Sequence, residues 1–211
     1  MEDTEERSKV MSNSNSSKII LHLCAGSGSD TQPYKDAGYD VRLVTKDIGV
    51  EYYTPPPNVY GIIANPPCTM FSLARTRAKT PRDFREGMKL VQHCLNIIWQ
   101  CRYEPLYRKD NCLKFWALEN PTGFLRQFLG RPVMTYHPYE YGHPYTKSTD
   151  IWGYFNEPKK NPIKLSLDDQ EKCKNNNRRL PSISEFTGSK QAEQRAVCPQ
   201  GFAQAFFNAN K

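Results

Sequence analysis

The chain has 211 residues, which is long for one domain and short for two, and its 38% hydrophobic and 12% aromatic residues suffice for one sizeable core. No apolar stretch approaches the roughly 20 residues needed to cross a bilayer, so we expect no membrane partner. The formal net charge of +7 fits an anionic partner, most commonly nucleic acid, although a basic surface without a specific ligand would give the same balance.

The cysteines indicate a reducing compartment. Their number is odd, no CxxC pair occurs, and only four histidines accompany them, so we expect neither disulfides nor a bound metal. Because the sequence shows no signal peptide, we expect a cytoplasmic protein. The seven cysteines are Cys24, Cys68, Cys94, Cys101, Cys112, Cys173 and Cys198.

The first elements alternate between strand and helix. Residues 1–17 are polar and lack apolar periodicity, which predicts a disordered tail. Residues 19–23 form an apolar strand followed directly by the letters CAGSGSD. Residues 30–37 can open a helix, and residues 39–44 alternate as a second strand.

The central part continues the alternation. Residues 52–58 contain three consecutive prolines and predict a loop, and residues 59–64 predict the next strand. Thr80, followed by Pro81 and an acid at Asp83, predicts a helix that starts with a hydroxyl N-cap. An apolar stripe then runs to about residue 99.

The C-terminal part completes the pattern. Residues 115–118 predict a buried strand that ends in Glu119-Asn120-Pro121, and residues 151–155 predict another. Residues 156–194 read as loops, and residues 199–210 as a short amphipathic helix. Strands alternating with helices indicate an α/β fold with a mainly parallel sheet.

Three features fall at the predicted carboxyl ends of strands, where such sheets bind ligands. They are the glycine-containing loop 24–29, Cys68 after the double proline, and Glu119. Each has a plain alternative: a tight turn, a buried turn cysteine, and a capping or solvated acid. The glycine loop lacks both the GxGxxG spacing and a following GKS or GKT, which disfavours dinucleotide and phosphate-loop sites. A cysteine, a carboxylate and a glycine loop at one sheet edge are nevertheless less expected by chance than any one alone.

The segments LHLCAGSGS, ANPPCTMFS and ALENPTGF occur in the order found in DNA cytosine-5 methyltransferases, and the chain resembles that family. A fourth segment, YGHPYTKSTDIWGYF at residues 141–155, resembles the family's YGxPQxRxR-type stretch, and residues 195–199 weakly resemble its last motif. The resemblance covers about residues 18–155 and the C-terminal helix. The PPC and EN pair is specific, whereas many S-adenosylmethionine enzymes share the first motif.

The resemblance implies a Rossmann-like class I methyltransferase fold, with helices on both faces of a mainly parallel sheet. It implies S-adenosylmethionine as methyl donor, S-adenosylhomocysteine as product, and DNA as substrate. The implied division is a disordered tail at 1–17, a catalytic donor-binding domain at 18–155, a short basic insert at 156–194 and a returning C-terminal helix at 195–211.

The residue types suit the family's chemistry. A thiolate that adds to carbon 6 of cytosine makes carbon 5 nucleophilic enough to accept a methyl group, and a cysteine can add and leave again. Cys68 would be this nucleophile, and Glu119 would neutralise charge near ring nitrogen 3. Lys147 stands where the family carries an arginine that holds the cytosine carbonyl, and it supplies charge without a bidentate fork. A base inside a duplex would have to be flipped out.

By resemblance, the methyl donor would be bound by the first loop, an acid after the second strand, and residues beside Cys68. For that acid we favour Asp47 over Glu51, although Thr45 stands nearer the family's position. The predicted donor-binding residues are His22, Cys24, Ala25, Gly26, Ser27, Gly28, Asp47, Asn65 and Pro66.

The sequence departs from the family in several places. The family usually has an acid in place of His22 and an aromatic in place of Cys24, and ENV is commoner than Glu119-Asn120-Pro121. The fourth segment carries Tyr145, Lys147 and Thr149 in place of Gln, Arg and Arg.

Only about forty residues, 156–194, stand where the family places a target-recognition domain. We therefore expect relaxed or short sequence specificity, or help from a second subunit in a homodimer. Basic side chains in the insert and after Cys68 suit phosphate contacts, although a solvated surface would explain them equally. The predicted nucleic-acid contacts are Arg75, Arg77, Lys79, Arg178 and Arg179.

Alternatives remain open at this point. The letters NPP also occur in amino methyltransferases, which modify exocyclic nitrogens but need an aromatic where Cys68 stands. A donor- and nucleic-acid-binding protein that has lost catalysis is a second alternative, and an enzyme acting on single strands, RNA or nucleotides is a third. A bacterial restriction-modification role and a phage-encoded one are both compatible with the sequence.

Overall fold

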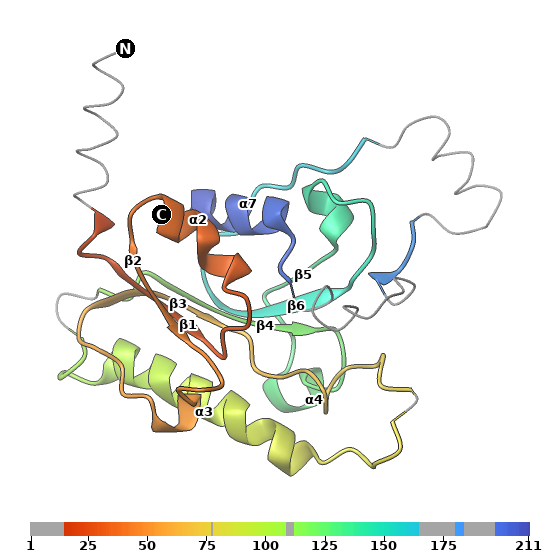
Figure 1. Cartoon of the computed structure of the whole chain (residues 1–211), viewed down its shortest axis with the longest axis horizontal. Coiled ribbons are helices and arrows are strands. Elements are labelled where there is room, and N and C mark those ends of the chain that lie inside the picture. Colours follow the sequence, from red (N-terminus) through yellow and green to blue (C-terminus); the bar gives the residue numbers. More distant parts are fainter. Residues whose placement is uncertain (1–14, 77, 109–111, 165–179, 184–196) are drawn as a thin grey trace.

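The computed structural model describes residues 15–76, 78–108, 112–164, 180–183 and 197–211, and one sheet organises them (Figure 1). Within these ranges six strands lie in the order β2-β1-β3-β4-β6-β5. The strands are β1 (Ile19–Leu23), β2 (Asp40–Val44), β3 (Val59–Ala64), β4 (Phe115–Pro121), β5 (Met134–Tyr136) and β6 (Thr149–Tyr154).

The sheet is mixed rather than purely parallel. Strand β1 pairs in parallel with β2 and β3, and β3 with β4, whereas β6 runs antiparallel to both β4 and β5. The prediction of a mainly parallel sheet therefore holds except at β6. The chain moves from β1 outward to β2 and then crosses to β3 on the other side of β1. This reversal creates a switch point between β1 and β3, which is where open α/β sheets bind ligands.

Helices cover both faces of the sheet, as expected for an α/β fold (Figure 1). The helical elements are η1 (Ser29–Thr31), α2 (Gln32–Asp36), η2 (Val50–Tyr52), α3 (Phe84–Tyr103), α4 (Arg126–Leu129), η3 (Pro138–Tyr141) and α7 (Gln200–Asn210). Helix α3 packs Val91, Cys94 and Ile98 into the cluster that contains Leu21 and Ile62 of the sheet.

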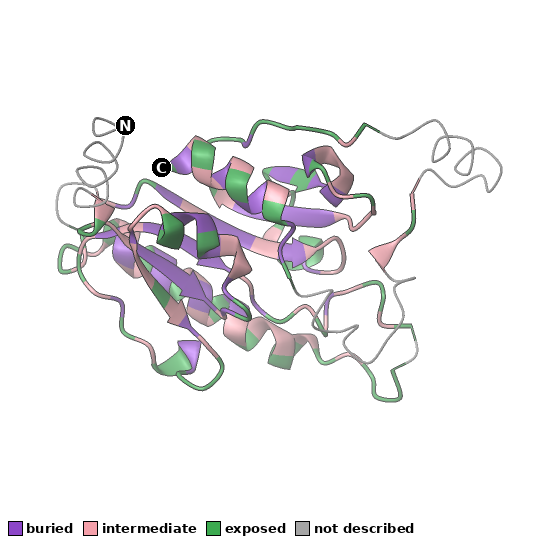
Figure 2. Ribbon diagram, turned by 45° about the horizontal axis from the view of Figure 1, so that its top comes forward, coloured by how far each residue is buried: buried purple, intermediate pink, exposed green. Residues whose placement is uncertain are grey.

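The opposite face is built largely from aromatic rings of α2 and α7. Phe202 and Phe206 of α7 share a core cluster with Tyr34 and Phe115, and the rings of Tyr34 and Phe115 stack with centroids 5.6 Å apart. Figure 2 shows the central strands as mostly buried between these layers. The predicted C-terminal helix thus covers the sheet, because its apolar face meets the aromatic layer.

Helix α3 differs from the sequence prediction at both ends. Its N-cap is Asp83, whose side chain accepts a hydrogen bond from the backbone N–H of Glu86 at 2.9 Å, and not Thr80. The helix continues to Tyr103 rather than ending near residue 99. Both Thr80 and Asp83 satisfy the capping preference, but the Thr80 hydroxyl accepts from Arg75 at 2.8 Å and not from the helix.

Strand β4 also runs further than predicted. Glu119, Asn120 and Pro121 belong to the strand and pair with Ile151, Asp150 and Thr149 of β6. The parallel partner β3 ends earlier, with Ala64 opposite Leu118. Glu119 therefore belongs to the strand and not to a loop after it. It lies one residue past Leu118, the last residue of β4 that pairs with β3, at the carboxyl edge of the parallel strands.

Strand β5 was not predicted, because three residues are too few to show a period of two. The predicted tail lies mostly outside the described residues; at its end, the amide of Asn15 donates to the Ala37 carbonyl at 3.0 Å. Most of the predicted insert, including residues 165–179, also lies outside the described residues. At its near end, the backbone N–H groups of Asn161 and Ile163 donate to the carbonyls of Glu140 and Tyr139.

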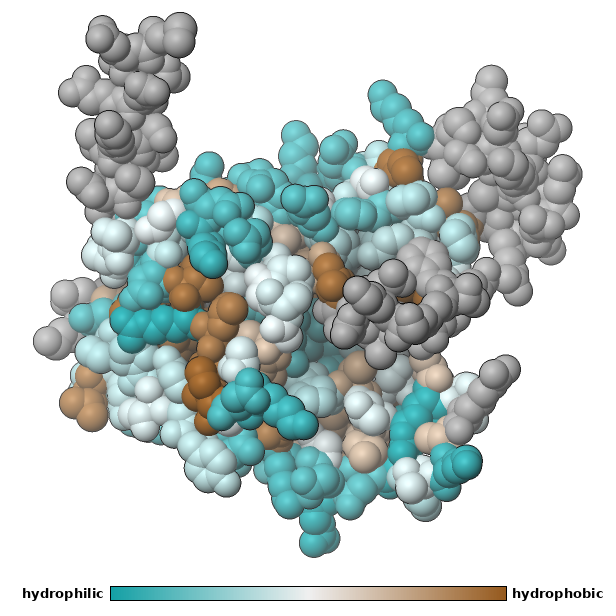
Figure 3. All heavy atoms as spheres, viewed as in Figure 1, coloured by the Kyte–Doolittle hydropathy of each residue, from teal (hydrophilic) through white to brown (hydrophobic). Residues whose placement is uncertain are grey.

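Among the described residues, no helix has the length and apolar character required to span a membrane. The face drawn in Figure 3 is mainly hydrophilic, with hydrophobic side chains gathered over the region of β2. Strand β2 is an edge strand, and four of its five residues are only partly buried or exposed. Such an edge leaves some apolar atoms in contact with solvent, as most protein surfaces do.

Candidate active site

The loop after β3 carries Cys68 to the carboxyl edge of the sheet. Asn65 still donates its backbone N–H to the Leu23 carbonyl at 3.0 Å, and the Asn120 side chain donates to the Pro66 carbonyl at 2.9 Å. Two prolines lack the N–H groups needed to continue the ladder, so the chain leaves the sheet here. Cys68 follows, half-buried, at the start of a turn in which its carbonyl accepts from Phe71 and Ser72.

The side chain of Arg82 holds this loop in place through hydrogen bonds to its backbone. Its guanidinium donates to the carbonyls of Met70 and Ser72, each at 2.8 Å, and lies 4.9 Å from the ring centre of Phe124. Such charge-assisted bonds to backbone oxygens are among the stronger hydrogen bonds in proteins. Arg82 is one of the basic side chains that follow Cys68 in the sequence, and in the structure it anchors the loop that carries Cys68.

Glu119 lies largely buried among polar partners from other elements. Its carboxylate is 3.9 Å from the ammonium of Lys147 and accepts from the Asn65 amide nitrogen at 3.5 Å. Burial raises the pKa of Glu119 above its usual range, and the charge of Asp30 adds to the rise, while Lys147 and Asn65 oppose it. A carboxyl in this setting is biased toward its protonated form.

The pKa of the Cys68 thiol responds to the same groups. Burial is the largest cause and raises this pKa, the charge of Glu119 raises it further, and Lys147 lowers it. The structure therefore brings together the three predicted catalytic residues, which come from the loop after β3, from β4 and from the loop before β6. When Glu119 is protonated, it no longer raises the pKa of Cys68, whereas Lys147 still lowers it.

The glycine loop follows β1 with two residues in the left-handed region, Cys24 at φ 53° and Gly28 at φ 77°. A side chain at Gly28 would meet Leu43 at 3.0 Å, so this position suits glycine, whereas Gly26 faces open space. Ser27 donates its hydroxyl to Ser29 at 3.1 Å. Gly26 and Ser27 are the exposed residues of this loop, at the switch point of the sheet.

Four of the nine residues predicted to bind the donor are buried, namely His22, Ala25, Gly28 and Pro66. His22 is only 1% exposed and sits inside β1. Ala25, also buried, donates its N–H to the Val44 carbonyl at 2.9 Å. His22 thus lies within the sheet, and Ala25 ties the start of the loop to the end of β2.

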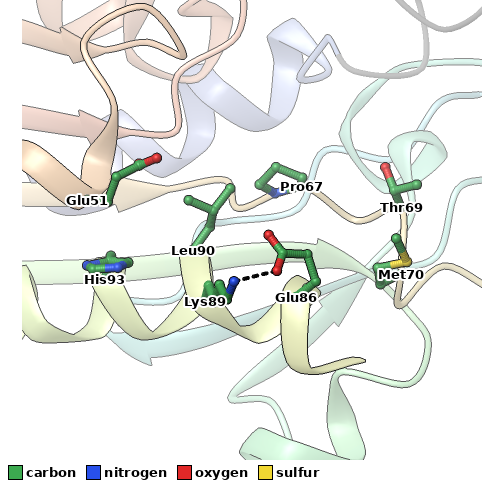
Figure 4. Close-up of a pocket in the computed structure, with 9 residues that line it drawn as sticks. Glu51, Pro67, Thr69, Met70, Glu86, Lys89, Leu90 and His93 are labelled. Carbon is green, nitrogen blue, oxygen red and sulfur yellow. Dashed lines mark ion pairs between the residues drawn. The ribbon is translucent and has the colours of Figure 1, made fainter. Parts of the chain in front are cut away.

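A hollow of about 470 Å³ opens beside the loop that carries Cys68 (Figure 4). Side chains from η2, from the loop after β3 and from α3 face it, and Lys89 and Glu86 form an ion pair at 2.6 Å on its wall. The lining residues are Glu51, Pro67, Thr69, Met70, Glu86, Gly87, Lys89, Leu90 and His93. None of the nine predicted donor-binding residues lines this hollow. Glu51, the acid that was ranked below Asp47, does.

A much smaller cavity, about 20 Å³, adjoins Glu119 and has room for one water molecule. Asp30, Glu119 and Cys198 line it together with apolar side chains. The backbone N–H of Cys198 donates to the Ser29 hydroxyl at 3.0 Å, so the chain before α7 returns to the glycine loop. Residues 195 and 196 of the weak last motif lie outside the described residues.

The predicted nucleic-acid contacts are described only in part. Lys79 is exposed, and Arg75 donates to the Thr80 hydroxyl at 2.8 Å. Arg77, Arg178 and Arg179 lie outside the described residues. In the part of the chain that the structure describes, no group of three or more His, Cys, Asp or Glu side chains could hold a metal ion.

Sequence reasoning overlooked two site features. Asp30, interpreted only as the start of a helix, reaches Asn65, and Asn120 holds the Pro66 carbonyl. The only sequence feature that could have indicated Asp30 is its position two residues after Gly28, the last glycine of the loop. No local pattern predicts its contact with Asn65.

No protein-family model matches the chain, and no curated protein matches it significantly. Among solved structures, the chain is similar to the crystal structure of a protein assigned as a DNA modification methyltransferase encoded within an E. coli prophage. The TM-score is 0.41 and the identity 14%, and the match covers 65% of this chain but only 46% of that protein. A likeness of this size carries no argument about chemistry, which therefore rests on the site itself.

Proposed function

We propose that the chain is an S-adenosylmethionine-dependent methyltransferase that modifies carbon 5 of cytosine in DNA. The observation that carries this proposal is the convergence of Cys68, Glu119 and Lys147 at one sheet edge. A buried carboxyl with a raised pKa, a nearby thiol and a cation that acts on both match the acid, nucleophile and counter-charge that the reaction needs.

In the proposed reaction Cys68 is the nucleophile and Glu119 is the proton donor. The Cys68 thiolate adds to carbon 6 of the cytosine while Glu119 gives its proton to ring nitrogen 3, so that charge does not accumulate on the ring. Carbon 5 then has enamine character and can accept a methyl group. A base then removes the proton from carbon 5, the bond between Cys68 and carbon 6 breaks, Cys68 leaves as a thiolate, and the proton on ring nitrogen 3 returns to Glu119.

S-adenosylmethionine, when bound, supplies the methyl group on an electrophilic sulfonium. The hollow suits its nucleoside part, because Pro67 and Leu90 offer apolar contact and Glu51 offers a carboxylate for ribose hydroxyls. The backbone of the glycine loop, open at Gly26, suits its amino-acid part. The hollow's volume lies within the usual range for a small-molecule site.

DNA is the substrate class that best fits the net charge of +7 and the basic side chains after Cys68. Since the thiol is half-buried at the sheet edge, a target base must leave its stack to reach it. A homodimer and a short recognition site remain part of the proposal, because the segment between residues 156 and 194 is brief.

The amino methyltransferase alternative is weaker on this geometry. An exocyclic amine is a hydrogen-bond donor, so Asn65 would have to offer its side-chain oxygen to the target. That oxygen already lies 3.0 Å from the buried ring nitrogen Nε2 of His22. The thiol of Cys68 would also have no part in that chemistry.

The test uses tritiated S-adenosylmethionine and DNA that contains 5-fluorocytosine. Because the fluorine cannot be removed as a proton is, a covalent protein–DNA adduct should accumulate in the wild type and in Cys112→Ser. The adduct should be absent in Cys68→Ser, and peptide mass spectrometry should locate it at Cys68.

Two results would contradict the proposal. Methyl transfer that survives Cys68→Ser would favour an amino methyltransferase. Donor binding measured by calorimetry, without an adduct on duplex DNA, single-stranded DNA or RNA, would favour a binding protein that has lost catalysis.

A further inference from the structure

The side-chain amide of Asn65 lies between two carboxylates. Its nitrogen Nδ2 is 3.4 Å from Oδ1 of Asp30 and 3.5 Å from Oε2 of Glu119. Its oxygen Oδ1 is 3.0 Å from Nε2 of His22. An amide nitrogen only donates and a carboxylate only accepts, so the oxygen must face the imidazole and the nitrogen must face the acids.

His22 is fixed in turn from the glycine loop. The Thr31 hydroxyl lies 3.1 Å from the Gly28 carbonyl and 3.1 Å from Nδ1 of His22. Both His22 and Thr31 are almost fully buried, and burial lowers the pKa of His22 despite the nearby charge of Asp30. One chain of polar contacts therefore runs from the backbone of the glycine loop through His22 and Asn65 to Glu119.

We propose that Asp30 and Asn65 are positioning residues that prepare Glu119 as a proton donor, Asp30 by repelling its charged form and Asn65 by fixing the direction of its carboxyl group. This inference rests on the proposed function, in which Glu119 gives its proton to ring nitrogen 3 as Cys68 adds to carbon 6. The carboxylate left on Glu119 is then stabilised by the Asn65 amide and the Lys147 ammonium, which already lie beside it.

The small cavity supports this assignment because Asp30 and Glu119 both line it. Repulsion between two carboxylates acts strongly where little solvent separates them. Asp150, the other nearby acid, already forms an ion pair with Arg126 at 2.6 Å, whereas Asp30 faces a buried imidazole at 3.8 Å. Asp30 is therefore the acid whose charge Glu119 experiences most directly.

The ionisable groups around Glu119 come from every neighbouring element. Lys147 opposes the rise in its pKa, and Asp30 and Asp150 add to it. The thiols of Cys68 and Cys198 and the phenol of Tyr136 are neutral neighbours, since burial raises the pKa of each. The two positioning residues act with opposite signs, because the Asn65 hydrogen bond lowers the pKa of Glu119 while Asp30 raises it.

The test is a carbon-13 NMR titration of the Glu119 carboxyl carbon, assigned by its loss in Glu119→Gln. Asp30→Asn should lower the pKa of Glu119, and Asn65→Ala should raise it. Asp30→Glu, which keeps the charge, should stay close to the wild type. Asp36→Asn is the matched control, because it removes the same charge from an exposed position on α2 and should change nothing.

A pKa of Glu119 that does not fall in Asp30→Asn, or that falls equally in Asp36→Asn, would overturn the inference, and so would a pKa that does not rise in Asn65→Ala. Thermal melting and circular dichroism establish that each variant is folded. The titration needs no methyl transfer, so the two proposals can fail separately. If the pKa of Glu119 shifts as expected but no Cys68 adduct forms, only the proposed function is contradicted. If the adduct forms but the pKa does not shift, only the positioning role is contradicted.

The pH profile of turnover gives an independent readout. The wild type should lose activity as pH rises through the pKa of Glu119, since only the protonated form can give its proton. In Asp30→Asn this loss should begin at lower pH, by the same shift that the titration measures. A profile that keeps its midpoint while the rate falls would indicate a purely structural effect and contradict the positioning role.

Discussion

The ammonium of Lys147 lies 3.9 Å from the carboxylate of Glu119, and the two side chains are only 13% and 17% exposed. One comes from the loop before β6 and the other from β4, so the pair exists only in the folded chain. Lys147 lowers the pKa of both Glu119 and Cys68 and thereby opposes the effect of burial on each. One cation thus stabilises the charged forms of both the carboxyl group and the thiol.

Removing this cation should make Cys68 less reactive. In Lys147→Met the pKa of the Cys68 thiol should rise, because the favourable charge beside the thiolate is lost. Only the thiolate is alkylated, so iodoacetamide labelling of Cys68 at about pH 8 should slow several-fold and its pH midpoint should move upward. Mass spectrometry of the labelled peptide measures both the rate and its pH midpoint. Lys147→Arg should retain most of the rate, and Lys35→Met, at an exposed position of α2, should match the wild type. A midpoint that stays in place would contradict this view of Lys147.

The hollow distinguishes the two acids considered for the donor ribose. Glu51 lines it and Asp47 is not among its lining residues, so Glu51→Gln should weaken S-adenosylmethionine binding by about 10- to 100-fold, the effect of losing a charged hydrogen bond. Asp47→Asn should bind the donor like the wild type. Isothermal titration calorimetry of both variants decides between them, and the reverse result would restore the order that the sequence suggested.

The brace from Arg82 should be visible in stability. Arg82→Ala removes two bonds to the carbonyls of Met70 and Ser72 and the contact with the Phe124 ring, which should cost about 2 kcal/mol. For a chain of this size that corresponds to a fall of about 4–8 °C in Tm. Arg85→Ala, an exposed arginine three residues along, is the control and should melt near the wild type. Equal melting of both variants would show that the brace contributes nothing.

The start of α3 gives a local test. Asp83→Ala should destabilise the protein by about 1 kcal/mol, because the N–H of Glu86 loses its acceptor. Thr80→Ala should cost less, since its hydroxyl caps no helix and only accepts from Arg75. Chemical denaturation of the two variants compares them directly, and a larger loss in Thr80→Ala would place the cap where the sequence pattern put it.

Several elements could be located from local signals in the sequence alone. The apolar runs at residues 19–23 and 59–64 became β1 and β3, and the stripe after residue 83 became α3, because a period of two or of 3.6 needs no distant partner. The double proline located the end of β3, and with it Cys68, for the same reason.

Only the tertiary structure decided what surrounds Glu119. Strand β6 runs antiparallel to β4 and extends it past Leu118, so Glu119 lies in a strand that the sequence ended one residue earlier. Asp30 and Glu119 are far apart in the chain, and Asn65 comes between them only because β1, β3 and β4 are neighbours in the sheet. Strand pairing at long range, burial and the meeting of charges depend on the whole fold, and they set the ionisation of this carboxyl.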